Sequence, residues 1–164
     1  MKAVQIYTDG SCLSNPGGKS AYAAVILVDG LEIKTYGGYH SSTSNRMEVM
    51  AVVRALEQLI EPCDVTVYSD SKYVVSSING WISHWKKSNF RGRANVDLLT
   101  RLVDASEQHK VQAVWVKSHN GNHYNEMCDQ ICTDIVSGKI AVGWKHDYFY
   151  LWFMSKNEQQ NKEE

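Results

Sequence analysis

The N-terminal part of the chain contains three strand-like segments separated by two turns, and this arrangement limits the possible folds more than any other feature. Apolar and polar residues alternate over residues 4–9, as in a half-buried strand. Residues 15–18 (Asn-Pro-Gly-Gly) are a turn signal before an apolar segment at 22–28, and Asp29-Gly30 is a strong hairpin signal before 31–39. The sequence therefore predicts three consecutive antiparallel strands.

Beyond this region, helices alternate with short strands. Further strands are expected at residues 65–69 and 111–117, and helices at 43–60, 71–79, 81–87, 96–108 and 125–136. Such an order indicates an α/β fold with a mixed five-stranded sheet, three antiparallel strands followed by two parallel ones. Helices are expected on both faces of the sheet.

The 164 residues are enough for one domain, since a chain of this size buries about 70% of its unfolded surface. We assign residues 1–138 to that domain, 139–154 to an aromatic extension and 155–164 to a disordered polar tail. There is no leader-like segment after Met1-Lys2 and no apolar run of membrane-spanning length. The four cysteines lie in predicted strands and helices, so a reducing, cytoplasmic location is expected.

Four acidic residues each lie in a distinctive local sequence. Asp9 is in Tyr-Thr-Asp-Gly-Ser, Glu48 in Asn-Arg-Met-Glu, Asp70 in Tyr-Ser-Asp-Ser and Asp129 in Asn-Glu-Met-Cys-Asp. Carboxylates at element ends or beside apolar stripes are costly to desolvate unless a cation joins them. Two divalent cations about 4 Å apart would relieve the repulsion between such carboxylates, and this pair is the machinery of phosphodiester cleavage.

Three of the four acidic residues, all except Glu48, also have an ordinary structural interpretation. Glu48 shares a helical face with Val52 and Leu59, which directs its carboxylate toward the core. Asp70 ends a strand and begins a helix, where open α/β sheets bind ligands, but aspartate is also a favoured N-cap. Asp9 before a glycine could serve a turn, and Asp129 could be an exposed helix residue. The four together favour the functional interpretation.

The order Asp–Glu–Asp–Asp, with these flanking residues, resembles the type 1 ribonuclease H family from residue 7 to about residue 129. The resemblance implies an endonuclease that cleaves the RNA strand of RNA/DNA hybrids and leaves 5′-phosphate and 3′-hydroxyl ends. It implies two Mg²⁺ ions, for which Mn²⁺ substitutes, held by Asp9, Glu48, Asp70 and Asp129. His119, in Lys-Ser-His-Asn-Gly, matches the family's loop histidine, which shuttles protons or assists product release; otherwise it is a solvated turn residue.

The resemblance also implies substrate contacts. Cys12, Asn15 and Asn45 match positions that read the 2′-hydroxyl in the minor groove, although Asn15 before a proline could serve the turn alone. Thr43 and Asn95 match a pocket for a phosphate of the DNA strand. A basic, tryptophan-bearing handle matches Trp81, Trp85, Lys86, Lys87, Arg91 and Arg93. With a net charge of −1, the basic surface must be local, and the handle residues could instead be helix packing beside a solvated loop.

The chain departs from the family pattern at three places. The handle is shorter than in the longer bacterial members and has fewer cations, which predicts a weaker grip on the DNA strand. Ser41 stands where many relatives place an arginine. Lys72 occupies a position often held by a neutral amide, so it adds attraction for the substrate without readout of the 2′-hydroxyl.

Competing functions are less consistent with the sequence. A zinc site from His119, His123, Cys128 and Cys132 has plausible spacing, but both cysteines fall on an apolar helical stripe. Proofreading-type exonucleases carry Asp-x-Glu on the first strand, and transposases use the order Asp–Asp–Glu; this chain has neither. A hybrid-binding module without catalysis would be expected to lose carboxylates, and this chain keeps all four.

The resemblance ends before an aromatic run at residues 144–154. If exposed, this run would be an adhesive apolar patch, so we expect it to pack on the domain or extend the sheet. The alternative is a contact with a partner or with a second copy of an otherwise monomeric protein.

Overall fold

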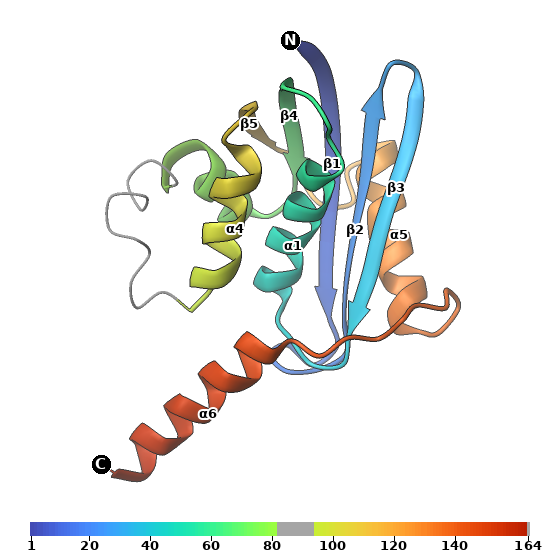
Figure 1. Cartoon of the computed structure of the whole chain (residues 1–164). Coiled ribbons are helices and arrows are strands. Elements are labelled where there is room, and N and C mark those ends of the chain that lie inside the picture. The colour runs from blue at the N-terminus through green and yellow to red at the C-terminus, as the bar shows by residue number, and fades with distance from the viewer. Residues whose placement is uncertain (82–93, 164) are drawn as a thin grey trace.

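The computed structural model describes residues 1–81 and 94–163, with only the backbone of Trp81 and Glu163. Its sheet consists of β1 (Lys2–Cys12), β2 (Ser20–Val28), β3 (Leu31–Tyr39), β4 (Cys63–Ser69) and β5 (Lys110–Trp115). The strand order is β3-β2-β1-β4-β5 (Figure 1). β1 pairs antiparallel with β2 and parallel with β4, which in turn pairs parallel with β5. The predicted mixed sheet is confirmed.

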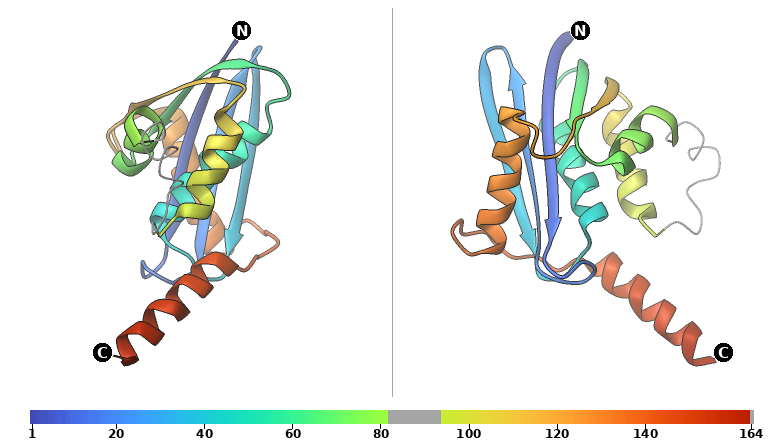
Figure 2. Two further views of the ribbon diagram at one scale, coloured as in Figure 1. Left: turned by 60° about the vertical axis from the view of Figure 1, so that its left-hand side comes forward. Right: turned by 180° about the vertical axis from the view of Figure 1, so that it is seen from behind.

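Helices cover both faces of the sheet, as predicted (Figures 1 and 2). The helical elements are α1 (Ser44–Glu57), α2 (Lys72–Ser76), the π-helix η1 (Ser77–Trp81), α4 (Val96–Ser106), α5 (His123–Val136) and α6 (Tyr148–Glu163). α1 packs on β1 and β2 from one side and carries α4 on its outer surface, whereas α5 packs on the same two strands from the other side.

Alternation along β2 separates two apolar layers. Tyr22, Ala24 and Ile26 are buried in the layer that contains α1, while Ala21, Ala23 and Val25 are buried in the layer that contains α5. In the second layer these residues are joined by Cys128, Cys132 and Ile135, all fully buried. Small residues at this level let α5 lie close to the strands that carry the candidate site.

The helix predicted after β4 differs from the observed elements. The helix that follows β4 is N-capped by Ser71, whose side chain accepts a hydrogen bond from the Val74 amide, and not by Asp70. It then widens into η1, where Asn79 exchanges two hydrogen bonds of 2.8 Å with the backbone of Ala113 on β5. These bonds tie the helix to the sheet edge. The helix expected at 81–87 lies outside the described residues.

The C-terminal segment packs on the domain with only part of its aromatic run. Trp144 packs beside the α5 layer, and Lys145 forms an isolated bridge with Tyr39 at the end of β3. Tyr150 is buried, but Tyr148 and Trp152 are 75% and 54% exposed. The start of the segment therefore packs on the domain, as we expected. One face of α6, which includes Tyr148 and Trp152, remains exposed to solvent.

The polar residues expected to be disordered instead continue α6 to Glu163. Residues 155–163 contain Lys, Glu and Gln and no Gly or Pro, a composition that favours helix. Within the described residues, none of the helices combines the length and apolar character that crossing a membrane requires.

Candidate active site

Three of the four predicted carboxylates meet at one end of the sheet. Asp9 lies on β1, Glu48 near the start of α1 and Asp70 directly after β4, and each offers an oxygen within 4.8 Å of the others. β1 and β4 are adjacent and parallel, so residues near their carboxyl ends lie side by side.

Gly10 permits this approach of α1 to β1. A Cβ atom at Gly10 would lie 2.4 Å from the Glu48 backbone nitrogen and 2.6 Å from the carbonyl carbon of Met47. Both are backbone atoms of α1, which cannot yield without moving the helix. The glycine after Asp9 is therefore required for the spacing between Asp9 and Glu48, and a turn role does not explain it.

The cluster is electrostatically unfavourable without a cation. Burial, followed by the nearby charge of Asp70, raises the pKa of Asp9 to about 7. Burial also raises the pKa of Glu48, and the charges of Asp9 and Asp70 raise it further. Glu48 Oε2 has no hydrogen-bond partner within the described part of the chain. Oxygen donors alone, crowded and partly unsatisfied, fit a hard divalent cation such as Mg²⁺ or Mn²⁺.

Asp129 lies beside this cluster and outside the three-carboxylate group. It lines a small pocket together with Asp70 and His119, and its charge contributes to the raised pKa of Asp9. The structure therefore brings Asp129 to the same edge as the other three predicted acids.

Asp70 is held in place by two residues that the sequence analysis did not identify. The Ser118 hydroxyl donates to Asp70 Oδ2 over 2.8 Å, and the Trp115 indole donates to the Asp70 carbonyl over 3.1 Å. The ammonium of Lys72 lies 5.5 Å from the centre of the Trp115 ring, which places Lys72 beside the site. Since Ser71 is the N-cap, capping does not account for Asp70.

His119 lies in the turn between β5 and α5 with a left-handed φ of 54°. The turn is fastened at its far end, where the Gly121 amide donates to Glu126 Oε1 and the Asn125 side chain donates to the Tyr68 carbonyl on β4. The imidazole is thus carried by a segment that is tied to β4, the strand directly before Asp70.

Four of the predicted substrate-contacting residues line one cleft of about 410 Å³: Asn15, Thr43, Asn45 and Asn95. Thr43 is the N-cap of α1, and Asn95 occupies the N-cap position of α4. Asn15 Oδ1 accepts a hydrogen bond from the Ser44 amide, which joins the first turn to α1. Cys12 instead directs its thiol toward backbone carbonyls, including that of Ser42 at 3.5 Å.

The remaining predicted substrate residues are those of the handle. Trp85, Lys86, Lys87, Arg91 and Arg93 lie outside the described residues, as does the side chain of Trp81.

The zinc alternative is not supported by the geometry. The thiols of Cys128 and Cys132 point to the backbone of β1, at 3.3 Å from the Tyr7 carbonyl and 3.7 Å from the Asp9 carbonyl. Burial raises the pKa of both thiols, which opposes the thiolate form that binds zinc.

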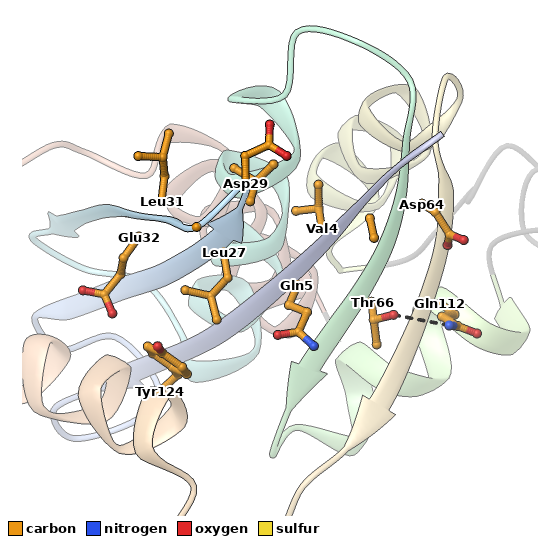
Figure 3. Close-up of a pocket in the computed structure, with 13 residues that line it drawn as sticks. Val4, Gln5, Leu27, Asp29, Leu31, Glu32, Asp64, Thr66, Gln112 and Tyr124 are labelled. Atoms are coloured by element: carbon orange, nitrogen blue, oxygen red, sulfur yellow. Dashed lines mark hydrogen bonds between the residues drawn. The ribbon is translucent and has the colours of Figure 1, made fainter.

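A larger hollow of about 530 Å³ lies at the opposite end of the sheet, around the start of β1 and the β2–β3 turn (Figure 3). Figure 3 shows Gln5, Thr66 and Gln112 side by side on the open sheet surface, where Gln112 donates to the Thr66 hydroxyl over 3.3 Å. One of its carboxylates, Asp29, is paired with Lys2. Among the described residues that line this hollow, no catalytic groups converge.

Comparison with known proteins agrees with the geometry. The family model for RNase H matches residues 1–137. The chain belongs to the ribonuclease H family. Ribonuclease HI of Helicobacter pylori is 44% identical over 131 residues, 80% of this chain and 91% of that protein. Ribonuclease HI of Campylobacter jejuni is 40% identical over 134 residues, 82% of this chain and 91% of that protein.

Solved structures share the ribonuclease H fold. LC9-RNase H1, a type 1 RNase H with the type 2 active-site motif, matches with a TM-score of 0.76 and 22% identity over 93% of this chain and 81% of that one. LC11-RNase H1 in complex with an RNA/DNA hybrid matches with a TM-score of 0.65 and 19% identity over 84% of this chain and 99% of that one.

In this ribonuclease H, the sequence analysis also missed a buried charge network beside the cleft. Arg46 is 2% exposed, and its guanidinium donates to Asp97 over 2.8 and 2.7 Å and to Asp147 over 2.7 and 2.9 Å. Ser42 donates to Asp147 over 2.6 Å. The sequence feature that could have indicated this network is the position of Arg46, two residues before Glu48 on a helical segment that faces the core.

Proposed function

We propose that this ribonuclease H hydrolyses the RNA strand of RNA/DNA hybrids with two divalent cations, leaving 5′-phosphate and 3′-hydroxyl ends. The observation that carries the proposal is the convergence of Asp9, Glu48 and Asp70 oxygens within 4.8 Å, with the pKa of Asp9 raised to about 7. Family membership and the hybrid complex of the LC11 protein support the choice of substrate.

The carboxylates would hold the cations. Asp9, Glu48 and Asp70 offer converging oxygens, and Asp129 lies beside Asp70 to complete the set. When bound, Mg²⁺ or Mn²⁺ supplies Lewis-acid activation of water and charge neutralisation at the scissile phosphate. Ser118 and Trp115 keep Asp70 oriented for this task from the adjacent loop and strand.

His119 is proposed to move a proton. His119 is exposed and lines the same small pocket as Asp70 and Asp129. A histidine there can accept or donate a proton near the leaving oxygen, or draw the product phosphate away.

Substrate binding is proposed to use the 410 Å³ cleft at the N-terminal ends of α1 and α4. Amides and hydroxyls of Asn15, Thr43 and Asn45 suit 2′-hydroxyl and phosphate groups presented along a wide minor groove. Lys72 adds positive charge next to Asp70, and we retain the handle and Cys12 as proposed contacts. All four cysteines are free thiols, which supports the proposal of a reducing, cytoplasmic location. We also propose that the enzyme is a monomer.

The test is cleavage of an end-labelled RNA/DNA hybrid with Mg²⁺, with Mn²⁺ and with EDTA, beside single-stranded RNA and duplex DNA. We expect metal-dependent internal cuts in the RNA strand of the hybrid alone. Equal cutting of duplex DNA, or cleavage that survives EDTA, contradicts the proposal. Tight hybrid binding without cleavage at any metal concentration would indicate a binding module instead.

A further inference from the structure

Helix α6 begins at the same end of the sheet as the carboxylates and runs outward beneath the N-terminal ends of α1 and α4 (Figures 1 and 2). Its start is firmly attached. Asp147, directly before α6, is 6% exposed and is bound by Arg46 and Ser42. The Arg46 guanidinium lies 5.1 Å from the centre of the Phe149 ring. The direction in which α6 leaves the domain is therefore fixed by its first turn.

The attached part of α6 forms one wall of the 410 Å³ cleft. Tyr150, Phe153 and Met154 line this wall. The opposite wall contains the amides and hydroxyl for which we propose contacts with the hybrid, among them Thr43 and Asn95. α6 therefore lines the same cleft as Asn15, Thr43, Asn45 and Asn95, the residues for which we propose contacts with the substrate.

The two walls have complementary chemistry. One presents amide and hydroxyl groups, which suit a sugar–phosphate backbone, and the other presents two aromatic rings and a thioether, which suit the flat face of a base or the apolar face of a sugar. A nucleotide offers both kinds of surface at once.

The first ten residues of α6 have a charge that suits a polyanion, whereas the rest of the helix adds Glu158, Lys162 and Glu163. Residues 148–157 contain no carboxylate and one cation, Lys156. The Lys156 ammonium lies 5.9 Å from the centre of the Trp152 ring, an exposed pairing of cation and aromatic. Aromatic rings interleaved with cations are typical of surfaces that bind nucleic-acid strands.

We propose that α6 is a second nucleic-acid contact. Phe153 and Met154 pack against a nucleotide of the DNA strand of the hybrid, and Thr43 and Asn95 bind the phosphate of that nucleotide. This inference rests on the proposed function. It gives the C-terminal segment a role in substrate affinity, and the exposed Trp152 and Lys156 extend the contact along the same strand.

The test compares cleft-facing and outward-facing positions on the same helix. Phe153→Ala is paired with Leu151→Ala, because Leu151 is 43% exposed and does not line the cleft. Hybrid affinity is measured by fluorescence anisotropy in EDTA, and KM by cleavage with Mg²⁺. We expect Phe153→Ala to weaken affinity about tenfold with a parallel rise in KM, and Leu151→Ala to stay within about twofold.

A second pair of variants tests the same contrast at two exposed positions, where a substitution is not expected to unfold the protein. Met154→Glu and Leu151→Glu introduce the same charge at exposed positions, and only the first places it in the cleft. Met154→Glu is expected to bind the hybrid more weakly than Leu151→Glu, by a factor that shrinks at high salt. Melting temperatures establish that the variants are folded.

The outcomes separate the two proposals. Equal affinities across both pairs, with normal hybrid cleavage by the wild-type chain, overturn the role of α6 and leave the proposed function intact. Tighter binding by Phe153→Ala also overturns it, since α6 would then cover the cleft rather than serve it. Absence of hybrid cleavage by the wild-type chain contradicts the proposed function itself.

Discussion

Ser118 donates a hydrogen bond to the Oδ2 atom of Asp70 over 2.8 Å and so connects the loop after β5 to the end of β4. Trp115, on β5, holds the backbone of the same aspartate through its carbonyl. The carboxylate that follows β4 is therefore oriented from the neighbouring strand and its loop. Metal affinity at this site should depend on residues that bind no metal themselves.

Ser118→Ala is expected to weaken divalent metal binding without unfolding the protein. A hydrogen bond of this kind contributes about 0.5–1.5 kcal/mol, so the dissociation constant for Mn²⁺ should rise roughly 2- to 10-fold. Isothermal titration calorimetry measures this directly, and Ser118→Thr, which keeps the hydroxyl, is the control. Equal metal affinity in the alanine and threonine variants would show that the bond does not orient Asp70.

Asp70→Asn is expected to lower hybrid cleavage by roughly two orders of magnitude or more, because the amide keeps the shape of the side chain and loses the charge that would hold a cation. The fold should persist, since Ser71 and not Asp70 caps α2. Cleavage rates at saturating Mg²⁺ and far-ultraviolet circular dichroism check both parts. A folded variant with wild-type turnover would remove Asp70 from the proposed metal set.

His119→Ala is expected to lower turnover by about 10²-fold, the lower limit of the loss expected for Asp70→Asn, and to leave metal affinity intact. The imidazole shares a pocket with Asp70 and Asp129 but does not belong to the group of three converging carboxylates. Single-turnover cleavage and Mn²⁺ titration separate these effects. Loss of metal binding in this variant would identify His119 as a ligand instead of a proton carrier.

The sheet could be predicted from sequence because its signals are local. Alternation in β1 and β2 and the turn at Asp29-Gly30 each act within a few residues, and the parallel pairing of β4 follows from the intervening helix. The direction of Glu48 was likewise readable from the helical period. These features need no knowledge of distant residues.

Long-range partnerships could not be predicted in the same way. Arg46 and Asp147 are 101 positions apart, and the local sequence around either residue does not indicate that it pairs with the other. The same holds for Ser118 and Asp70, which meet only after β4 and β5 have paired. Residues 155–163 were expected to be disordered because they have few apolar side chains, but their high helix propensity allows them to continue α6.

The raised pKa of Asp9 predicts a specific pH dependence in EDTA. Its pKa in the folded chain is about 7, above the ordinary value of 3.8, so the protonated carboxyl favours the folded state. This contribution is fully present below about pH 4 and is lost as the pH rises through about 7. The raised pKa of Glu48 acts in the same direction.

Asp9→Asn should therefore melt at a higher temperature than the wild-type chain at pH 8 in EDTA, by a margin that disappears near pH 4. The expected difference in unfolding free energy at pH 8 is on the order of a few kcal/mol at most. Mg²⁺ should stabilise the wild-type chain more than the variant. A margin that does not change with pH would contradict the buried, repelling arrangement of these carboxylates.

Truncation of the C-terminal segment should separate its anchoring part from its exposed part. A chain that ends at Gly143 loses Asp147, so that Asp97 is the carboxylate partner left to the buried Arg46 among the described residues. It also loses the packing of Trp144 and Tyr150. Breaking a buried ion pair costs about 3–5 kcal/mol, which corresponds to a fall in melting temperature of roughly 6–20 °C for a domain of this size.

A chain that ends at Met154 is the matched control. It keeps Asp147 and Tyr150 and loses residues 155–164, of which 155–162 are exposed, so its melting temperature should stay within about 2 °C of the full chain. Both truncated chains retain all four carboxylates, so turnover per folded molecule at saturating hybrid should persist in each. Equal melting temperatures for the two truncated chains would contradict the anchoring of this segment through Asp147, Trp144 and Tyr150, which only the longer chain keeps.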